Sequence, residues 1–318
     1  MKLKYVSDLA PGDKLSDIFL VTHKELKPKK DGSNYLYFRL TDKTGSINAQ
    51  LWDGLEKYSR WPEKGDHCLV KGAVKDYKST IQVTISEFVA VKDKDIEKQD
   101  YLPPMKFDPE ETFTRLKELL EFVKNAHLRS LIDEFLKDTE LVANLKKLPA
   151  GSKKHHAYPC GLMIHMTSML RSALQLCQVY PELDKDVLLT GIFIHDIGKT
   201  RELTFEDCFS YSDEGELLGH IGIGVNLLER MTSALPGFPG PLKMQLEHII
   251  LSHHGEYEYG APVLPKTKEA LTVHFLDNLD SKLDAYKQSF DNLQPEVNWS
   301  GWTGDRKFYR PSPEKEPD

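Results

Sequence analysis

The stretch VLLTGIFIHDIGKT (residues 187–200) ends a long apolar run with a histidine and an aspartate, His195 and Asp196. Its composition predicts a buried helix that closes just before Gly198. An ionised carboxylate is costly to bury unless a partner charge or a cation compensates it. The pair therefore raises the question of which other groups stabilise it in the interior.

The size and composition of the chain set the frame for an answer. Its 318 residues suffice for about two domains, and its 40% hydrophobic content supports a sizeable core. The sequence has neither an apolar run of about 18 residues nor an apolar stretch near its start, so we expect no membrane helix and no signal peptide. The four cysteines form no CxxC pair. Such cysteines are typical of reduced thiols and predict a cytoplasmic protein.

Charge is distributed unevenly along the chain. Residues 1–98 carry 18 Lys and Arg against 15 Asp and Glu, whereas the remainder carries 24 against 34. A basic first part suits contact with a polyanion, and an acidic remainder suits bound cations. The basic excess is small, so the motifs must decide the function.

Residues 1–98 have the pattern of a small β-barrel. Short charged or glycine-bearing stretches of turn composition punctuate the β-rich runs, and a helical insert is expected near residues 55–60. This number of strands in a segment of this size predicts an OB-fold, the small barrel that binds oligonucleotides. The runs cover residues 15–26, 35–42, 46–52, 67–77 and 80–91.

The rest of the chain has a helical pattern. A charged, proline-bearing stretch predicts a linker at residues 99–112, before an all-α domain at 113–310 and a flexible tail at 311–318. Within the helical part, apolar residues recur at spacings of three and four. The predicted helices cover residues 112–123, 127–138, 160–180, 184–197, 218–235, 242–254 and 268–286.

Nine of the twelve histidines lie between residues 155 and 274. Each one alone is most simply explained as a core residue or a helix cap. Several of them, with two aspartates, come from separate predicted helices and point to the interior, which favours a shared metal site. Imidazole and carboxylate donors together suit Mn, Fe, Co or Zn. The candidate residues are His165, His195, Asp196, His220, His253, His254 and Asp277.

This ordered set resembles the HD-domain superfamily of metal-dependent phosphohydrolases. The longer words HDIGKT, LLGHIGIG and ILSHHGEYEYGAPVLPKTKEA resemble one branch of it, the YhaM-type 3′–5′ exoribonucleases. That branch also places an OB-fold before the HD domain. The resemblance spans roughly residues 1–310 and implies two divalent transition-metal ions, with Mn expected first and Fe or Co as alternatives.

The resemblance also implies a role for each residue of the set. One ion would be held by His165, His195, Asp196 and Asp277, and the second by Asp196, His220 and His253. Asp196 would bridge the ions, Lys199 would contact a phosphate oxygen, and His254 would be either a ligand or a phosphate contact. Asp196, Lys199 and His254 are thus the expected catalytic residues.

Three positions near the first metal helix complete this comparison. Ile164 stands where the family is expected to have an acid, so a carboxylate that supports a ligand is expected to be missing there. His155 and His156 precede the helix and are candidate substrate contacts.

The second and third predicted strands form a candidate nucleic-acid surface. Alternation turns Leu36, Phe38 and Leu40 inward, which leaves the residues between them on the outside. An OB-fold binds single strands on this face, and bases stack on its aromatic rings. Alternatively, the face is an ordinary exposed surface or contacts the helical domain. The candidate residues are Tyr35, Tyr37, Arg39 and Trp52, with Lys29 and Lys30 in the preceding loop.

Together these observations favour a cytoplasmic two-metal 3′–5′ exonuclease that degrades single-stranded RNA, with single-stranded DNA as a further candidate substrate. The 3′–5′ polarity follows from the resemblance alone. The sequence does not decide whether the chain forms a homo-oligomer. One alternative is an HD phosphodiesterase of small nucleotides such as cyclic dinucleotides, with the barrel as a regulatory or oligomer contact. Another is an RNA-binding adaptor whose HD site is inactive. The absence of a Walker-type glycine loop argues against an NTPase.

Overall fold

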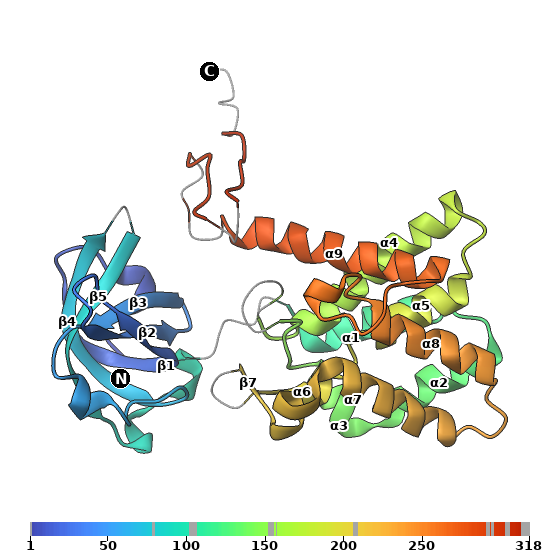
Figure 1. Cartoon of the computed structure of the whole chain (residues 1–318), viewed down its shortest axis with the longest axis horizontal. Coiled ribbons are helices and arrows are strands. Elements are labelled where there is room, and N and C mark those ends of the chain that lie inside the picture. The colour runs from blue at the N-terminus through green and yellow to red at the C-terminus, as the bar shows by residue number, and fades with distance from the viewer. Residues whose placement is uncertain are drawn as a thin grey trace. The chain divides into compact units, whose positions relative to one another are not determined.

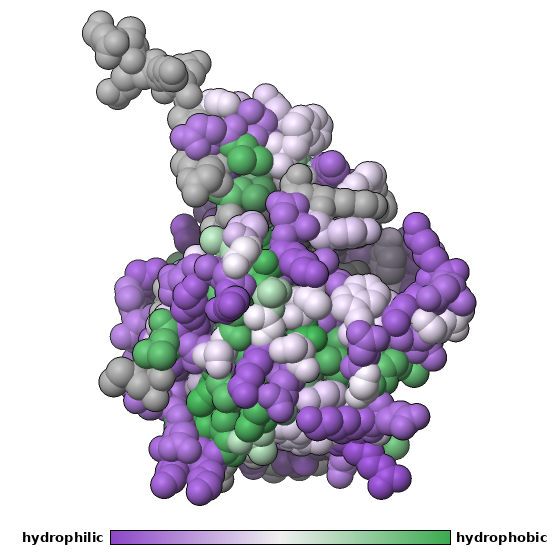
Figure 2. Space-filling view, turned by 90° about the vertical axis from the view of Figure 1, so that its left-hand side faces the viewer, coloured by the Kyte–Doolittle hydropathy of each residue, from purple (hydrophilic) through white to green (hydrophobic). Residues whose placement is uncertain are grey.

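A computed structural model describes residues 2–77, 80–101, 107–151, 156, 158–205, 209–290, 293, 296–302 and 306–312. The chain divides into two compact units, a β-barrel and a helical unit (Figure 1). The visible face in Figure 2 is largely hydrophilic, with smaller groups of hydrophobic residues between the polar ones. No helix of the described residues is long and apolar enough to span a membrane.

The first unit is a closed five-stranded barrel in the order β1-β2-β3-β5-β4. The β3–β5 pair is parallel and every other pair is antiparallel. This strand count and closure confirm the predicted OB-fold. A short 3₁₀ helix, Leu55–Tyr58, occupies the place of the predicted helical insert. The strands are β1 (Lys14–Pro28), β2 (Asn34–Asp42), β3 (Gly45–Leu51), β4 (His67–Tyr77) and β5 (Thr80–Ala90).

Alternation along the strands fills the barrel as predicted. Leu36, Phe38 and Leu40 of β2 are buried, and the residues between them are partly or fully exposed. At Gly72 of β4 the register shifts, and a Cβ there would collide with the backbone carbonyl of Thr84. Glycine therefore permits the close approach that bends β4 around the barrel.

The chain beyond β5 continues to contact the barrel. Two further 3₁₀ helices follow, at Asp93–Asp95 and Lys98–Asp100. The Asp100 carboxylate accepts hydrogen bonds from Lys43 Nζ at 2.7 Å and from the Tyr5 hydroxyl at 2.9 Å. Residues 98–101 thus pack with the first unit, while the first helix of the second unit already begins at Pro109, inside the segment predicted as linker.

The second unit is helical, as predicted. Its longer helices match the predicted runs, but two short helices (α3 and α6) and a small hairpin (β6–β7) were not predicted. These elements are too short to show a hydrophobic period. The helices are α1 (Pro109–Leu120), α2 (Ala126–Lys137), α3 (Thr139–Leu145), α4 (Gly161–Val179), α5 (Lys185–Ile194), α6 (Lys199–Glu202), α7 (Asp213–Ser233), α8 (Gly240–Ser252) and α9 (Lys268–Gln288), with strands β6 (Leu203–Phe205) and β7 (Phe209–Tyr211).

Helix α5 lies at the centre of this unit. The Asp184 side chain caps its first turn by accepting from the backbone N–H groups of Asp186 and Val187. From Val187 onward the helix is buried on all sides, because α4, α8 and α9 pack around it. The apolar run of the sequence therefore serves to deliver His195 and Asp196 into the middle of the helical unit.

Candidate metal centre

Five helices bring the predicted ligands together. His165 projects from α4 and Asp277 from α9, while His195 and Asp196 follow the end of α5. His253 follows α8, and His220 begins the regular part of α7 after Gly219, which has φ of 64°. Residues this far apart in the sequence meet because their helices pack around one hydrophobic core.

Glycines allow the closest of these approaches. A Cβ at Gly198 would collide with the carbonyl of His220, so only glycine lets the turn after Asp196 touch α7. Gly219 provides the left-handed backbone that reorients α7 just before His220. Both glycines therefore set the position of His220 relative to Asp196.

Asp196 is the central residue of the group. Its side chain is almost fully buried, with 2% exposure for the residue. Oδ1 lies 3.6 Å from His220 Nε2 and 3.5 Å from His253 Nε2, and Oδ2 lies 3.4 Å from His195 Nε2. One carboxylate thus faces imidazoles from three separate elements.

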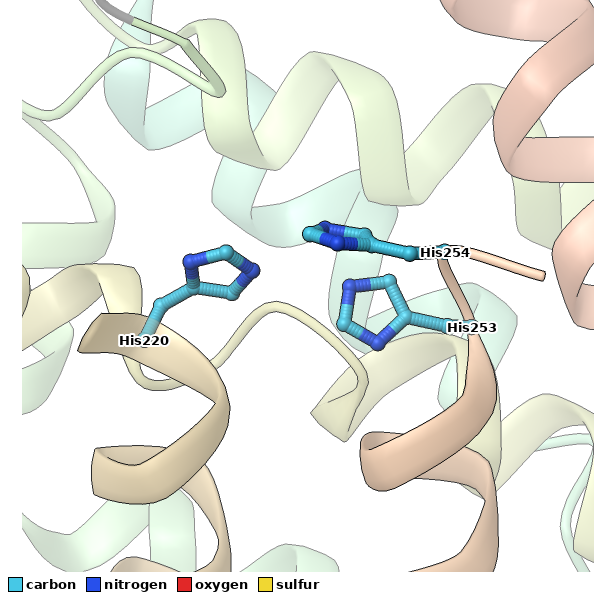
Figure 3. A group of neighbouring side chains, drawn as sticks. All are labelled: His220, His253 and His254. Atoms are coloured by element: carbon cyan, nitrogen blue, oxygen red, sulfur yellow. The ribbon is translucent and has the colours of Figure 1, made fainter. Parts of the chain in front are cut away.

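The imidazoles form two groups on either side of Asp196. The donor atoms of His165, His195 and Asp277 all lie within 4.8 Å of one another. The same holds for His220, His253 and His254, which Figure 3 shows converging from two different helices. Every predicted ligand is therefore in one of the two groups or, for Asp196, beside them.

Hydrogen bonds fix the orientation of each ring. His195 Nδ1 donates to the Ile192 carbonyl at 2.7 Å, and His253 Nδ1 donates to the Ile250 carbonyl at 2.8 Å. A backbone carbonyl can only accept, so the proton is on Nδ1 and the lone pair is on Nε2. His254 is held in the same way by the Tyr259 carbonyl. Rings held like this are typical of metal ligands.

The remaining atoms of the group fit a bound cation. The Nε2 atoms of His195, His220 and His253 lie beside the Asp196 carboxylate, and these nitrogens and Asp196 Oδ1 are buried without a hydrogen-bond partner within the described part of the chain. Their separations of 3.4–3.6 Å are too long for good hydrogen bonds. Buried polar groups are normally satisfied, so these atoms together mark a place for an ion.

Electrostatics maintain charge at this depth. Burial raises the pKa of the Asp196 carboxyl, but Lys199 and the neighbouring imidazoles outweigh it and hold that pKa well below its usual range. The Lys199 ammonium lies 2.6 Å from Asp196 Oδ2, and this pair raises the pKa of Lys199 against the effect of burial. Burial lowers the pKa of His254 to about 4, with a further contribution from His253. His254 is therefore neutral at pH 7 and can coordinate an ion.

Two carboxylates that the sequence analysis missed support the rings. Asp280 Oδ2 lies 2.7 Å from His165 Nδ1, and Glu202 Oε1 lies 3.1 Å from His220 Nδ1. Asp280 is one helical turn beyond Asp277, which was the available signal. The support that was expected to be missing at Ile164 thus comes from Asp280 on another helix.

The two remaining histidine candidates differ. His156 is buried and bonds Asp280 through Nε2 at 2.7 Å, so it lies behind His165 as part of the supporting network. This position gives no support to a substrate contact. His155 lies outside the described residues.

The barrel face that the sequence predicts to bind nucleic acid carries polar and aromatic side chains that contact one another. The rings of Tyr35 and Trp52 stack with centroids 4.6 Å apart, and Lys29 Nζ donates to the Trp52 carbonyl at 3.1 Å. The Tyr37 hydroxyl donates to Asn48 Oδ1 at 2.7 Å. Arg39 and Lys30 are exposed. The face thus combines aromatic rings, an amide and basic groups.

Comparison with known proteins defines the class of this chain. Residues 162–282 match the HD domain family, and residues 20–91 match the family described as OB-fold nucleic acid binding domain. The chain is therefore an HD-domain protein with an OB-fold ahead of the metal centre.

Curated relatives specify the family. The 3′-5′ exoribonuclease YhaM of Shouchella clausii is 32% identical over 309 residues, which cover 96% of each chain. The YhaM of Bacillus subtilis is 31% identical over 89% of this chain and 90% of its own. That of a Geobacillus strain is 32% identical over 88% and 86%. The chain belongs to the YhaM family.

Proposed function

We propose that this chain is a metal-dependent 3′–5′ exoribonuclease that shortens single-stranded RNA, the activity for which its relatives are named. The observation that carries the proposal is the convergence of three buried imidazole nitrogens on the Asp196 carboxylate, where they have no hydrogen-bond partner among the described residues. A metal-binding donor set in one unit and an OB-fold in the other together suit hydrolysis of a nucleic acid.

The centre has donors for two divalent ions. In the proposed assignment His165, His195, Asp196 and Asp277 hold one ion, and Asp196, His220 and His253 hold the other, with His254 as a further ligand. Mixed imidazole and carboxylate donors suit Mn²⁺, with Fe²⁺ or Co²⁺ as alternatives. Two such ions, when bound, supply Lewis acidity and activate water for attack on a phosphodiester.

Lys199 is the protein's own positive charge at this centre. Its ammonium is held against Asp196 Oδ2, so its direction is fixed before substrate arrives. We propose that this ammonium contacts a non-bridging oxygen of the scissile phosphate. A preorganised charge at that place stabilises the extra negative charge of the transition state.

The barrel face is assigned to single-stranded RNA. The Tyr35–Trp52 pair offers a ring face to a base. Tyr37 and Arg39 lie on the same strand as Tyr35, and Lys29 and Lys30 lie in the loop before it. Stacking requires no 2′-hydroxyl, so single-stranded DNA is a plausible second substrate. A cytoplasmic location belongs to the same proposal, because Cys68, Cys160 and Cys177 are all free thiols.

A labelled oligonucleotide tests the proposal. The full chain is stripped of metal, reloaded with Mn²⁺ and incubated with a single-stranded RNA of about 20 nucleotides labelled at its 5′ end. We expect a ladder of products shortened from the 3′ end, and elemental analysis with about two ions per chain.

The same assay separates the alternatives. Cleavage of dinucleotides without a ladder would replace the proposal with a small-nucleotide phosphodiesterase. RNA binding by a metal-loaded but inert protein would replace it with an adaptor. Asp196→Asn on the same RNA serves as the control for a contaminating nuclease.

A further inference from the structure

The chain ends in a small hairpin that neither predicted binding surface includes. Beyond α9, Trp299 pairs with Tyr309 in an antiparallel bridge, and the Ser300 N–H donates to the Phe308 carbonyl at 2.9 Å (Figure 1). We call the described residues between 296 and 312 the C-terminal hairpin.

Contacts with the end of α9 hold this hairpin in place. The Tyr286 hydroxyl donates to the Tyr309 carbonyl at 3.0 Å, and the Phe308 ring meets the Tyr286 ring at 5.4 Å. The Arg310 guanidinium lies 4.7 Å from the centre of the Phe290 ring. The hairpin is thus packed against the end of α9 and the residue Phe290 just after it.

The hairpin also carries exposed aromatic side chains. Trp299 is 58% exposed, Trp302 is 72% exposed and Tyr309 is 52% exposed. The other two tryptophans of the chain are less exposed, with Trp52 of the barrel face at 37% and Trp61 partly buried. Grouped exposed rings are unfavourable in water and commonly mark a binding surface.

The charge of the hairpin favours a polyanion as its ligand. Residues 296–312 carry three basic residues, Arg306, Lys307 and Arg310, against two acidic ones, whereas residues 99–318 as a whole carry an acidic excess. Lys307 Nζ lies 5.6 Å from the centre of the Trp302 ring. Rings beside basic groups are what single-stranded nucleic acid binds, through stacked bases and paired phosphates.

Helix α9 connects the hairpin to the metal centre. Asp277 and Gln288, eleven residues apart, are separated by about 17 Å at the usual helical rise. A stacked strand needs about five nucleotides to cover that length. A strand whose 3′ end lies at the metal centre is therefore long enough to reach the hairpin only when several nucleotides remain.

We propose that the C-terminal hairpin is a second binding site for single-stranded RNA, which stacks bases several nucleotides upstream of the scissile bond on Trp299 and Trp302. This rests on the proposed function, because it takes the substrate of that function as its ligand. It also implies that short products lose this contact and are released.

Binding without turnover tests the site. Full-length Trp299→Ala with Trp302→Ala is compared with wild type by fluorescence anisotropy, using a labelled oligouridylate of about 20 nucleotides in EDTA. We expect the dissociation constant to rise about tenfold. Trp299→Phe with Trp302→Phe keeps the ring faces and is expected to bind nearly as wild type. Tyr180→Ala removes an exposed ring at the end of α4 and controls for general effects.

Turnover supplies the second measurement. With Mn²⁺, the alanine variant is expected to lose kcat/KM on the long RNA and to keep it on a trinucleotide, which is too short to reach the hairpin. An unchanged dissociation constant, or equal losses on both substrates, overturns the proposal. So does an oligomer that dissociates in the variant while RNA affinity is retained, because the hairpin would then be a contact between copies. If the wild type binds RNA through the hairpin but produces no ladder, the proposed function fails and the hairpin proposal stands.

Discussion

On the barrel, the outward-facing side chains of β2 and β3 are at least partly exposed and contact one another. In the metal centre, the Nε2 atoms of His195, His220 and His253 are buried and lie 3.4–3.6 Å from the Asp196 carboxylate, too far for good hydrogen bonds. The Tyr37 hydroxyl has Asn48 as its partner, and the Tyr35 ring has Trp52. In the centre, by contrast, Asp196 Oδ1 has no hydrogen-bond partner among the described residues.

The difference lies in what water can do for each region. An exposed group that loses its partner is hydrated again, so single changes on the barrel face cost little. A buried charge that loses its partner stays unsolvated, and its neighbours lose their orientation with it. Substitutions are therefore expected to have their largest effects at the metal centre and their smallest on the barrel.

Asp196→Asn should have the largest effect on activity. The carboxylate faces three imidazoles, and an amide cannot supply the same charge to two ions. We expect kcat to fall at least about a thousandfold, corresponding to roughly 4 kcal/mol. RNA affinity in EDTA should stay near that of wild type, because the barrel face is unchanged. Retained activity would refute the bridging role of Asp196.

Lys199→Ala should reduce turnover by about a hundredfold, the size seen when one preorganised group is removed from a transition state. Metal content by elemental analysis should change much less than kcat, because Lys199 is no ligand in the proposed assignment. Lys137→Ala, on the exposed side of α2, is the matched lysine control. A kcat equal to that of the control would remove Lys199 from the mechanism.

Periodicity and motif order were sufficient for the elements that carry a strong local signal. The β2 alternation placed Leu36, Phe38 and Leu40 inside, and the apolar run before His195 gave a helix buried all round. The ligand set was predicted from its order along the chain, by resemblance, and the structure brings its members together.

Partners that depend on three-dimensional packing could not be predicted in this way. Glu202 supports His220 through the short helix α6, which is too brief to show a period. Asp280 supports His165 across α4 and α9, residues more than a hundred positions apart. Ile164 stands where an acid was expected, so the sequence suggested a missing carboxylate. Sequence alone does not reveal that a different helix supplies it.

Asp280→Asn should affect metal binding more than folding. An amide oxygen can still accept from His165 Nδ1 while the amide NH2 donates to Ser168 Oγ, but the substitution removes the charge that strengthens the ring as a ligand. We expect Mn²⁺ affinity to fall about 10- to 100-fold, and excess Mn²⁺ to restore activity. Asp133→Asn, on the exposed side of α2, is the control. An unchanged Mn²⁺ affinity by calorimetry would reduce Asp280 to a packing role.

Tyr35→Ala with Trp52→Ala should have the smallest and most selective effect. Removal of the stacked pair is expected to weaken binding of long single-stranded RNA about tenfold, because base stacking on the rings is lost. Cleavage of a dinucleotide should be unaffected, since so short a ligand needs only the metal centre. Tyr35→Phe with Trp52→Phe keeps both ring faces and should bind as wild type. Equal losses on both substrates would mean that the pair stabilises the protein as a whole. Substitutions on the exposed barrel face would then not differ in kind from those in the buried metal centre.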